Sequence, residues 1–268
     1  MKFLKDLIDE SLKMINMYEL SAIQLALSIF SGVIVGFSLG LIGGGGSILA
    51  VPLLIYVVGF NFPHMAIGTT AFSVAVNALI NIVPHAMKRN FDLKIGAIFS
   101  LAGTAGVLLG NQLGLLTPGK RLLFLFGGLM IFVAIYMLKR GDFVAKSGSR
   151  SLAKLILFSL LVGFASGYFG IGGGFLIAPT LMFVGGLDIS KAIGTSLLSV
   201  GTFGLITALR YYISGQLDPL ISALFIVGGI FGGWWGSRLS VSLPKEILRK
   251  IFAAVLIVVG IYIMYSSW

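Results

Sequence analysis

The sequence predicts an all-α polytopic membrane protein with about 8–10 membrane helical segments, and three observations lead to this fold class. Of the 268 residues, 57% are hydrophobic and only 10% are charged, whereas a soluble domain carries about 25% charged residues. Apolar stretches follow one another along almost the whole chain. Two glycine-rich segments that resemble each other interrupt these stretches, one in each half of the chain.

Most of the apolar stretches reach the length of about 20 residues that a transmembrane helix needs. Two of them are too short and are predicted to be half-helices or re-entrant segments. Ahead of the stretches, residues 1–20 place apolar side chains on one helical face, which predicts an amphipathic interfacial helix. The stretches cover residues 21–42, 47–58, 64–86, 93–115, 121–138, 152–169, 174–186, 190–213, 219–238 and 247–266, of which 47–58 and 174–186 are the short ones.

An internal repeat relates the two halves. Four residues of the first half recur 127 positions later, namely Gly36, Gly40, Gly43 and Pro52. The motif Ala66-Ile-Gly-Thr69 recurs 126 positions later as Ala192-Ile-Gly-Thr195. A single one-residue slip over such a length indicates a duplication. The predicted units are the interfacial helix 1–20, repeat 1 at 21–139, a basic linker loop at 140–151 and repeat 2 at 152–268.

The relative orientation of the repeats depends on how often each one crosses the membrane. An odd number of crossings makes the halves inverted and gives one side of the membrane thirteen Lys and Arg residues against six. Four crossings in each repeat would make the halves parallel and would spread the charges more evenly. Because cytoplasmic loops carry an excess of Lys and Arg, the charges favour inversion. Interrupted hydrophobic segments in corresponding positions are also typical of transporters with inverted repeats.

The formal net charge of +10 does not indicate a nucleic-acid partner, because the basic residues lie in short loops between apolar stretches. The chain contains no cysteine, which excludes disulfides and thiolate metal sites. The expected surroundings are the lipid bilayer, with the chain as a multi-pass protein of the cell (inner) membrane. No cofactor and no metal are expected, and a homo-oligomer is left open.

The two glycine runs are the first candidates for a substrate site, because irregular backbone at membrane depth survives only inside protein or beside a water-filled cavity. Each run is expected to end where a new helix begins, at Ser47 or near Gly174. A helix start offers unpaired N–H groups and a positive dipole end, which can hold an anion. The alternative is close helix packing, which we favour for later glycines such as Gly103 and Gly229. The candidate residues are Gly43, Gly44, Gly45, Gly46, Ser47, Gly170, Gly172, Gly173 and Gly174.

A ladder of polar side chains at steps of four residues follows each run. Hydroxyl and amide groups can donate hydrogen bonds to an oxyanion as it loses water. The alternative is hydrogen bonding between helices, worth about 0.6–2 kcal/mol in membranes. The ladders are Thr69, Ser73, Asn77, Asn81, His85 and Thr195, Ser199, Phe203, Thr207, Tyr211. The substrate-binding candidates from this region are Thr69, Thr70, Ser73, Asn77, Thr195, Ser196 and Ser199.

No acidic residue lies at the centre of an apolar stretch, which suits an anionic substrate because intramembrane carboxylates mark proton relays or cation paths. His85 is a candidate for proton coupling, although the basic residues after it indicate an interfacial position. Arg210 is a candidate for anion guidance, although its side chain can also snorkel to the surface. Gly36-Phe-Ser-Leu-Gly40 matches a nucleophile-elbow pattern but has no base or acid nearby, so no enzymatic activity is expected.

At these same residues the sequence resembles the TauE/SafE family of membrane permeases, which includes sulfite exporters and 4-toluene sulfonate uptake permeases. The motifs of the resemblance are Gly40-Leu-Ile-Gly-Gly-Gly-Gly-Ser47 with Ala66-Ile-Gly-Thr-Thr70, and Gly167-Tyr-Phe-Gly-Ile-Gly-Gly-Gly174 with Ala192-Ile-Gly-Thr-Ser196. The resemblance covers nearly all of residues 22–266 and implies transport of small organosulfur or sulfur oxyanions. Ser47 has Gly174 as its counterpart, so the two half-sites are chemically unequal.

The sequence therefore predicts secondary transport of a small anion, a sulfur oxyanion or organosulfonate such as sulfite, by alternating access. The glycine runs and ladders would meet near the membrane midplane while one repeat rocks against the other. Two alternatives stay open, a passive anion channel and a membrane scaffold or receptor without transport.

Overall fold

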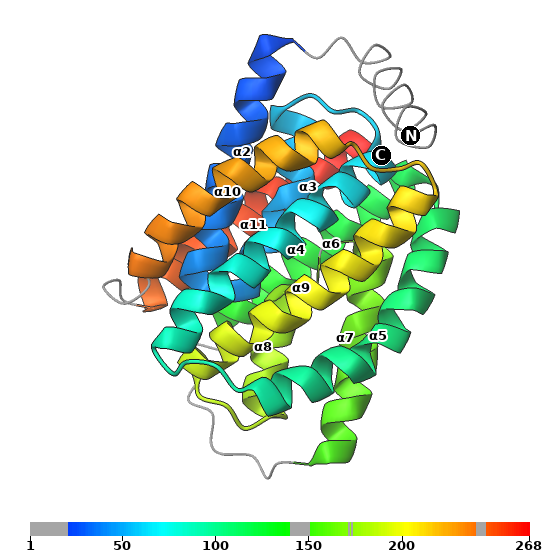
Figure 1. The fold of residues 1–268 in the computed structure, drawn as a ribbon. Coiled ribbons are helices and arrows are strands. Elements are labelled where there is room, and N and C mark those ends of the chain that lie inside the picture. The colour runs from blue at the N-terminus through cyan, green and yellow to red at the C-terminus, as the bar shows by residue number, and fades with distance from the viewer. Residues whose placement is uncertain (1–20, 140–150, 171, 173, 240–244) are drawn as a thin grey trace, which may run out of the picture.

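A computed structural model describes residues 21–139, 151–170, 172, 174–239 and 245–268. The predicted interfacial helix at 1–20, nearly all of the linker 140–151 and the candidate Gly173 lie outside the described residues. Within them the chain is helical and contains no strand (Figure 1). The predicted all-α membrane fold is confirmed, since seven of the described helices are long and apolar enough to cross a membrane.

The helices follow the predicted stretches closely. The long ones are α2 (Ala22–Ile42), α4 (Pro63–Met87), α5 (Leu93–Leu116), α6 (Gly119–Lys139), α7 (Leu152–Phe169), α9 (Ile189–Ile213), α10 (Pro219–Leu239) and α11 (Lys245–Ser267). Between α2 and α4 lie a 3₁₀ helix, η1 (Gly43–Leu49), one turn of α-helix, α3 (Ala50–Pro52), and a π-helical segment, η2 (Leu53–Val57). The short helix α8 (Gly174–Phe183) lies between α7 and α9.

Local capping chemistry fixes where several helices begin. The Asp92 carboxylate accepts a hydrogen bond from the backbone N–H of Ile95 at 3.0 Å, at the start of α5. The Asp218 carboxylate does the same for Ile221 at 2.9 Å, and Pro219 occupies the first position of α10. An acidic N-cap satisfies an orphan N–H group and complements the positive end of the helix dipole.

Both short segments return the chain to the end of the bundle from which it came. A Cβ added to Gly59, after η2, would lie 3.8 Å from Gln24 Nε2, near the start of α2. In the second half, Ser151 at the start of α7 and Gly185 after α8 line one pocket. Each predicted re-entrant segment therefore forms a hairpin with the long helix before it, and the chain enters and leaves the bundle on the same side.

The long helices begin at two opposite ends of the bundle. At end A the starts of α2, α4, α6 and α10 lie together, as the backbone N–H of Asp218 donates to Thr69 Oγ1 at 2.9 Å. At end B the starts of α5, α7, α9 and α11 lie together, and the N–H of Asp92 donates to Thr195 Oγ1, also at 2.9 Å. Figure 1 shows α2 beginning at the top and α7 at the bottom. Opposite starting ends are what an inverted repeat requires, and the duplication itself stays a prediction.

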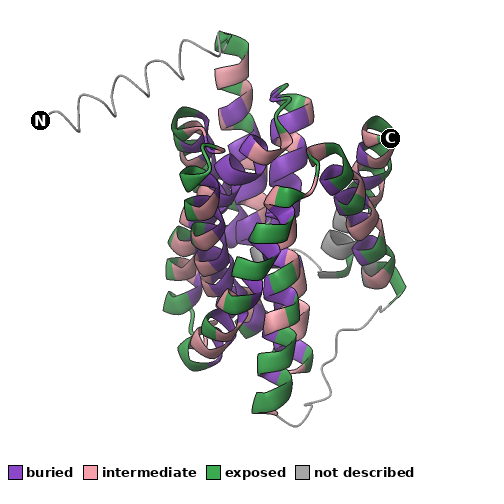
Figure 2. Ribbon diagram, turned by 90° about the vertical axis from the view of Figure 1, so that its right-hand side faces the viewer, coloured by how far each residue is buried: buried purple, intermediate pink, exposed green. Residues whose placement is uncertain are grey.

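The two halves exchange helices where they pack. Helix α2 of the first half lies along α10 of the second, and α7 of the second lies along α5 of the first. Helices α4 and α9 cross each other and are the most deeply buried of the long helices. Helices α6 and α11 form an outer pair. Figure 2 shows buried residues gathered in the middle and exposed ones on the outer helix faces, where a membrane protein meets lipid.

Glycines allow the closest of these helix contacts. A Cβ added to Gly106 of α5 would overlap the backbone oxygen of Leu160 in α7. A Cβ on Gly232 of α10 would likewise overlap the backbone oxygen of Val33 in α2. Small residues let membrane helices approach until their backbones touch. The packing role that we predicted for the later glycines is thus confirmed.

Candidate functional site

The first glycine run differs from its prediction. Its four glycines, with Gly44 and Gly45 among them, do not precede a helix that begins at Ser47. They form the first turns of η1, and α-helical geometry begins only at Ala50. Without Cβ atoms, consecutive glycines adopt the tight 3₁₀ winding without the side-chain crowding that usually limits it. The predicted helix start at Ser47 was therefore wrong.

The second glycine run is a true break between two helices. Helix α7 ends at Gly170, whose φ of +66° lies in the left-handed region, and Gly172 has φ +65°. Any residue with a Cβ is strained in this conformation, which explains why glycine stands at both positions. Helix α8 then begins at Gly174, as predicted.

Each glycine run packs against the Ala-Ile-Gly-Thr motif of the opposite half. A Cβ added to Gly170 would overlap the side chain of Ile67 in α4. A Cβ added to Gly43 would lie 2.8 Å from Ile193 Cγ2 in α9. Helix α8 also contacts η1, so the two runs meet in the middle of the bundle. We call this region the glycine centre: η1, Gly170, Gly172, Gly174 and the surfaces of α4 and α9 that face them.

Gly172 shows which surfaces those are. A Cβ added to Gly172 would lie 3.2 Å from Val200 Cγ1 of α9 and 3.7 Å from Val74 Cγ1 of α4. On α4, the face toward the glycine centre therefore carries Ile67 and Val74. On α9 it carries Ile193 and Val200, at the same spacing.

Thr70 and Ser196 lie on these two faces, since residues three and four apart are neighbours on a helix surface. Both side chains are buried. Thr70 Oγ1 donates to its own helix at Ala66 O, 2.7 Å away, and Ser196 Oγ donates to Ile193 O at 2.8 Å. Both bonds lie within the helix of their donor, and a hydroxyl can rotate from such a carbonyl toward a ligand.

Four of the ladder hydroxyls lie in two seams between helices. We call the contact of α4 with α10 the first seam and the contact of α5 with α9 the second seam. In the first, Thr69 accepts from the N–H of Asp218, and Ser73 Oγ donates to Ser222 O at 3.2 Å. In the second, Thr195 accepts from the N–H of Asp92, and the Ser199 and Ser100 hydroxyls are 2.9 Å apart. The seam hydroxyls thus bind neighbouring helices in this structure, and their contact with substrate stays a prediction.

Asn77 also belongs to the first seam. Its Nδ2 donates to Ser73 O at 3.0 Å, and its Oδ1 has no partner among the described residues. A Cβ added to Gly229 of α10 would overlap this amide, so the glycine makes room for it. Asn77 follows Thr70 by seven residues, about two turns, so both lie on the same side of α4, where Asn77 meets α10.

His85 and Arg210 lie outside the glycine centre, although His85 packs close to its edge: a Cβ added to Gly194, next to Ile193, would lie 3.0 Å from His85 Cβ. His85 is buried in the last turn of α4 at end B, about 16 Å along the helix from Val74. Arg210 lies in the last turn of α9 at end A, where its Nη2 donates to Gln112 Oε1 at 2.6 Å. They stand at opposite ends, so a role in coupling or guidance would be at an entrance and not in the centre.

Sequence reasoning missed two buried polar groups. Asn111 of α5 accepts a hydrogen bond from Thr207 Oγ1 at 3.1 Å, and its Nδ2 has no partner among the described residues. His64, at the start of α4, lies 6.3 Å from Tyr211 between ring centroids. An amide inside the apolar stretch 93–115 was the signal for Asn111. His64 gave no comparable signal because it stands at a stretch boundary.

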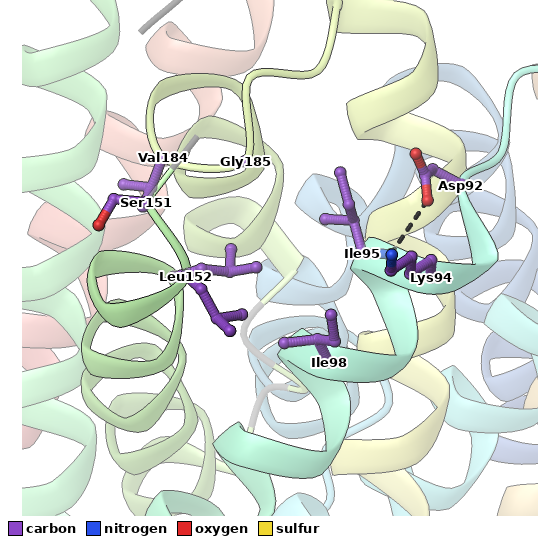
Figure 3. Close-up of a pocket in the computed structure, with 9 residues that line it drawn as sticks. Asp92, Lys94, Ile95, Ile98, Ser151, Leu152, Val184 and Gly185 are labelled. Atoms are coloured by element: carbon purple, nitrogen blue, oxygen red, sulfur yellow. Dashed lines mark hydrogen bonds between the residues drawn. The ribbon is translucent and has the colours of Figure 1, made fainter. Parts of the chain in front are cut away.

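The glycine centre is closed and free of charge. Its members whose burial the structure gives are buried, except Ile193, which is half-buried. Among the described residues, no buried side chain is Asp, Glu, Lys or Arg. A cavity of about 230 Å³ lies elsewhere, between α5 and α7 at end B (Figure 3).

A search of protein families gives the same family that the motifs resemble. The model described as sulfite exporter TauE/SafE matches residues 28–263. The chain belongs to the TauE/SafE family. No solved structure matches it.

The relatives of this TauE/SafE chain are named as membrane transporters, and their names give no substrate. It is 48% identical over 253 residues to a "Probable membrane transporter protein" of Xylella fastidiosa, covering 91% of this chain and 97% of the relative. It is 31% identical over 260 residues to one of Methanocaldococcus jannaschii, covering 87% and 94%. It is 26% identical over 239 residues to YdhB of Bacillus subtilis, covering 87% and 97%. The chain is therefore a multi-pass membrane protein of a transporter family.

Proposed function

We propose that this chain is a secondary transporter of a small anion, a sulfur oxyanion or organosulfonate such as sulfite, in the cell (inner) membrane. The description of the family supports the substrate class. The observation that carries the proposal is the glycine centre, where the hydroxyls of Thr70 and Ser196 flank two glycine runs in a buried region that, as far as the chain is described, holds no carboxylate.

The groups at the glycine centre match the chemistry of a sulfur oxyanion. Such an anion offers several acceptor oxygens, and the centre supplies donors: the hydroxyl groups of Ser47, Thr70 and Ser196 and the N–H groups at the start of α8, which have no acceptor within that helix. Glycine lets the anion approach the backbone closely, and the positive end of the α8 dipole favours its charge. The anion would cross chemically unchanged, so the proposal includes no catalytic residue and no cofactor.

The seams indicate which helices would move together during alternating access. The hydrogen bonds at Thr69 and Ser73 join α10 to α4, and α2 packs along α10. The second seam joins α5 to α9, and α7 packs along α5. The moving units would therefore be α2–α4–α10 and α5–α7–α9, each built from both halves. Their relative rotation would open the glycine centre to end A and end B in turn.

Flux through reconstituted vesicles tests the proposal. We expect saturable uptake of radiolabelled sulfite and accelerated exchange when unlabelled sulfite is present inside, because a carrier returns faster when loaded. An anion conductance far above the rates that carriers reach would contradict the carrier and favour the passive channel. No flux of sulfite, sulfate, thiosulfate or sulfonates, with no thermal stabilisation by any of them, would leave the scaffold or receptor alternative.

A further inference from the structure

The pocket between α5 and α7 at end B has two chemically different parts (Figure 3). Ile95 and Ile98 of α5 face Leu152 and Leu155 of α7 across an apolar floor, and Val184 closes one end. At the rim stand the ionic side chains of Lys94 and Asp92. The volume of about 230 Å³ holds part of one hydrocarbon chain but no folded partner.

The pocket opens onto the outer surface of the bundle and not toward the glycine centre. Leu152, which lines the pocket, is 59% exposed. Leu93, which stands between the lining residues Asp92 and Lys94 in the sequence, is 64% exposed. In a bilayer such apolar side chains face lipid. The pocket also lies at helix starts, which places it near the level of the lipid headgroups.

The charge around the pocket favours an anion. Asp92 is engaged as the N-cap of α5, so its carboxylate is already paired with backbone N–H and the helix dipole. Lys94 is exposed, and no carboxylate partner is found for it among the described residues. The exposed basic residues of the adjoining end-B turns add to this positive field: Lys88, Arg89, Lys154 and Lys191.

End B is also the more basic end: ten of the Lys and Arg residues that the structure describes lie there, and three lie at end A. The ten are Lys88, Arg89, Lys94, Lys139, Lys154, Lys191, Arg238, Lys245, Arg249 and Lys250, and the three are Lys120, Arg121 and Arg210. By the positive-inside rule end B is the cytoplasmic end, where the membrane surface carries anionic lipids. The residue 126 positions after Lys94, at the start of α10 and end A, is Leu220. Of the two corresponding positions, only the one at the end that faces anionic lipid therefore carries a lysine.

We propose that this α5–α7 pocket binds one anionic phospholipid, with an acyl chain on the apolar floor and the phosphate at Lys94. Basic pockets between membrane helices on the cytoplasmic side hold lipid headgroups in this way. An inorganic or sugar phosphate would gain nothing from the apolar floor, which makes up most of the lining. The bound lipid would fasten α7 to α5 within one of the proposed moving units, and its binding does not depend on what is transported.

Native mass spectrometry of the purified full chain tests this proposal by counting retained lipid. We compare phosphatidylglycerol with phosphatidylcholine of identical acyl chains, and add sn-glycerol 3-phosphate as a headgroup without chains. We expect the chain to retain phosphatidylglycerol in preference to phosphatidylcholine and to bind no glycerol phosphate. Lys94→Gln should weaken retention of phosphatidylglycerol about five-fold, the effect of one basic residue at a membrane surface.

The matched control is Lys120→Gln, which removes an exposed lysine at end A and should leave retention unchanged. Ile98→Trp fills the apolar floor and should weaken retention of both lipids, which separates chain binding from headgroup binding. Equal retention of the two lipids by the wild-type chain would overturn the proposal. So would wild-type retention in Lys94→Gln, equal losses in Lys94→Gln and Lys120→Gln, or displacement of the lipid by glycerol phosphate.

Discussion

Thr69 and Thr70 are neighbours on α4, but they belong to different regions of the molecule. Thr69 lies in the first seam, where it accepts a hydrogen bond from α10, whereas Thr70 lies on the face toward the glycine centre. Thr195 and Ser196 divide in the same way on α9. All four are buried, so burial does not separate a binding group from a structural one. The hydroxyls of Thr69 and Thr195 bind another helix, whereas those of Thr70 and Ser196 donate to carbonyls of their own helix.

Glycines show the same division. Those in the seams make room for a neighbouring side chain, as Gly229 does for Asn77 and Gly103 does for Phe203. Gly170 and Gly172 of the second run hold left-handed backbone, in addition to leaving space for Ile67 and Val200. The seams are thus built for close fit, and the centre is built around a break in the helices.

The largest effect is expected when the left-handed break is filled. Gly170→Ala adds a Cβ that overlaps Ile67 and strains a positive φ, so unfolding should become easier by about 2–4 kcal/mol and sulfite flux should fall more than ten-fold. Gly215→Ala is the control, because its φ is +68° and nothing lies within 4 Å of its Cβ. The free energy of unfolding of Gly215→Ala should fall by about 1 kcal/mol through strain alone, and its sulfite flux should equal that of the wild-type chain. Equal losses in both variants would show that Gly170 matters only for its backbone angle.

A seam glycine should affect stability more than transport. Gly229→Ala pushes against the Asn77 amide, and overpacking of this kind costs about 1–3 kcal/mol. In the double variant with Asn77→Ala, part of the loss should be recovered, because the added methyl then has space. Thermal unfolding of the two single variants and the double variant gives the coupling energy. Strictly additive losses would contradict the contact.

The smallest effect is expected for a single seam hydroxyl. Thr69→Val keeps the shape of the side chain but leaves the Asp218 N–H without its acceptor, which should destabilise the protein by about 1 kcal/mol. The affinity for sulfite should stay within about two-fold of wild type, because the Thr69 hydroxyl binds α10 and its removal costs the proposed site no bond to sulfite. Unfolding in detergent and saturation of sulfite uptake measure the two quantities on one preparation.

The fold was predictable because its signals are local. The length of the apolar stretches predicted where the long helices lie. The start of η1 was not predictable, because four glycines in a row carry no side chains that favour one helical winding over another. The glycine runs themselves could be found in the sequence because they interrupt an apolar pattern.

The direction of each ladder residue could not be predicted from spacing alone. Adjacent residues such as Thr69 and Thr70 differ by about 100° around the helix, and only the packing of α10 and the glycine runs decides which one meets the centre. The same holds for Asn111, whose partner Thr207 is distant in the sequence. Side-chain direction is a property of the assembled bundle.

The most direct test of the glycine centre is the affinity for sulfite of two matched double variants. Thr70→Val with Ser196→Ala removes the two hydroxyls on the α4 and α9 faces of the centre, and Thr69→Val with Thr195→Val removes one hydroxyl from each seam. We expect the first to raise the KM for sulfite more than ten-fold with little change in unfolding temperature, since each hydrogen bond to an anion contributes about 1.5–3 kcal/mol. The second should lower the unfolding temperature and leave KM near wild type. An unchanged KM in the first variant, or a raised KM in the second alone, would contradict a substrate site at the glycine centre.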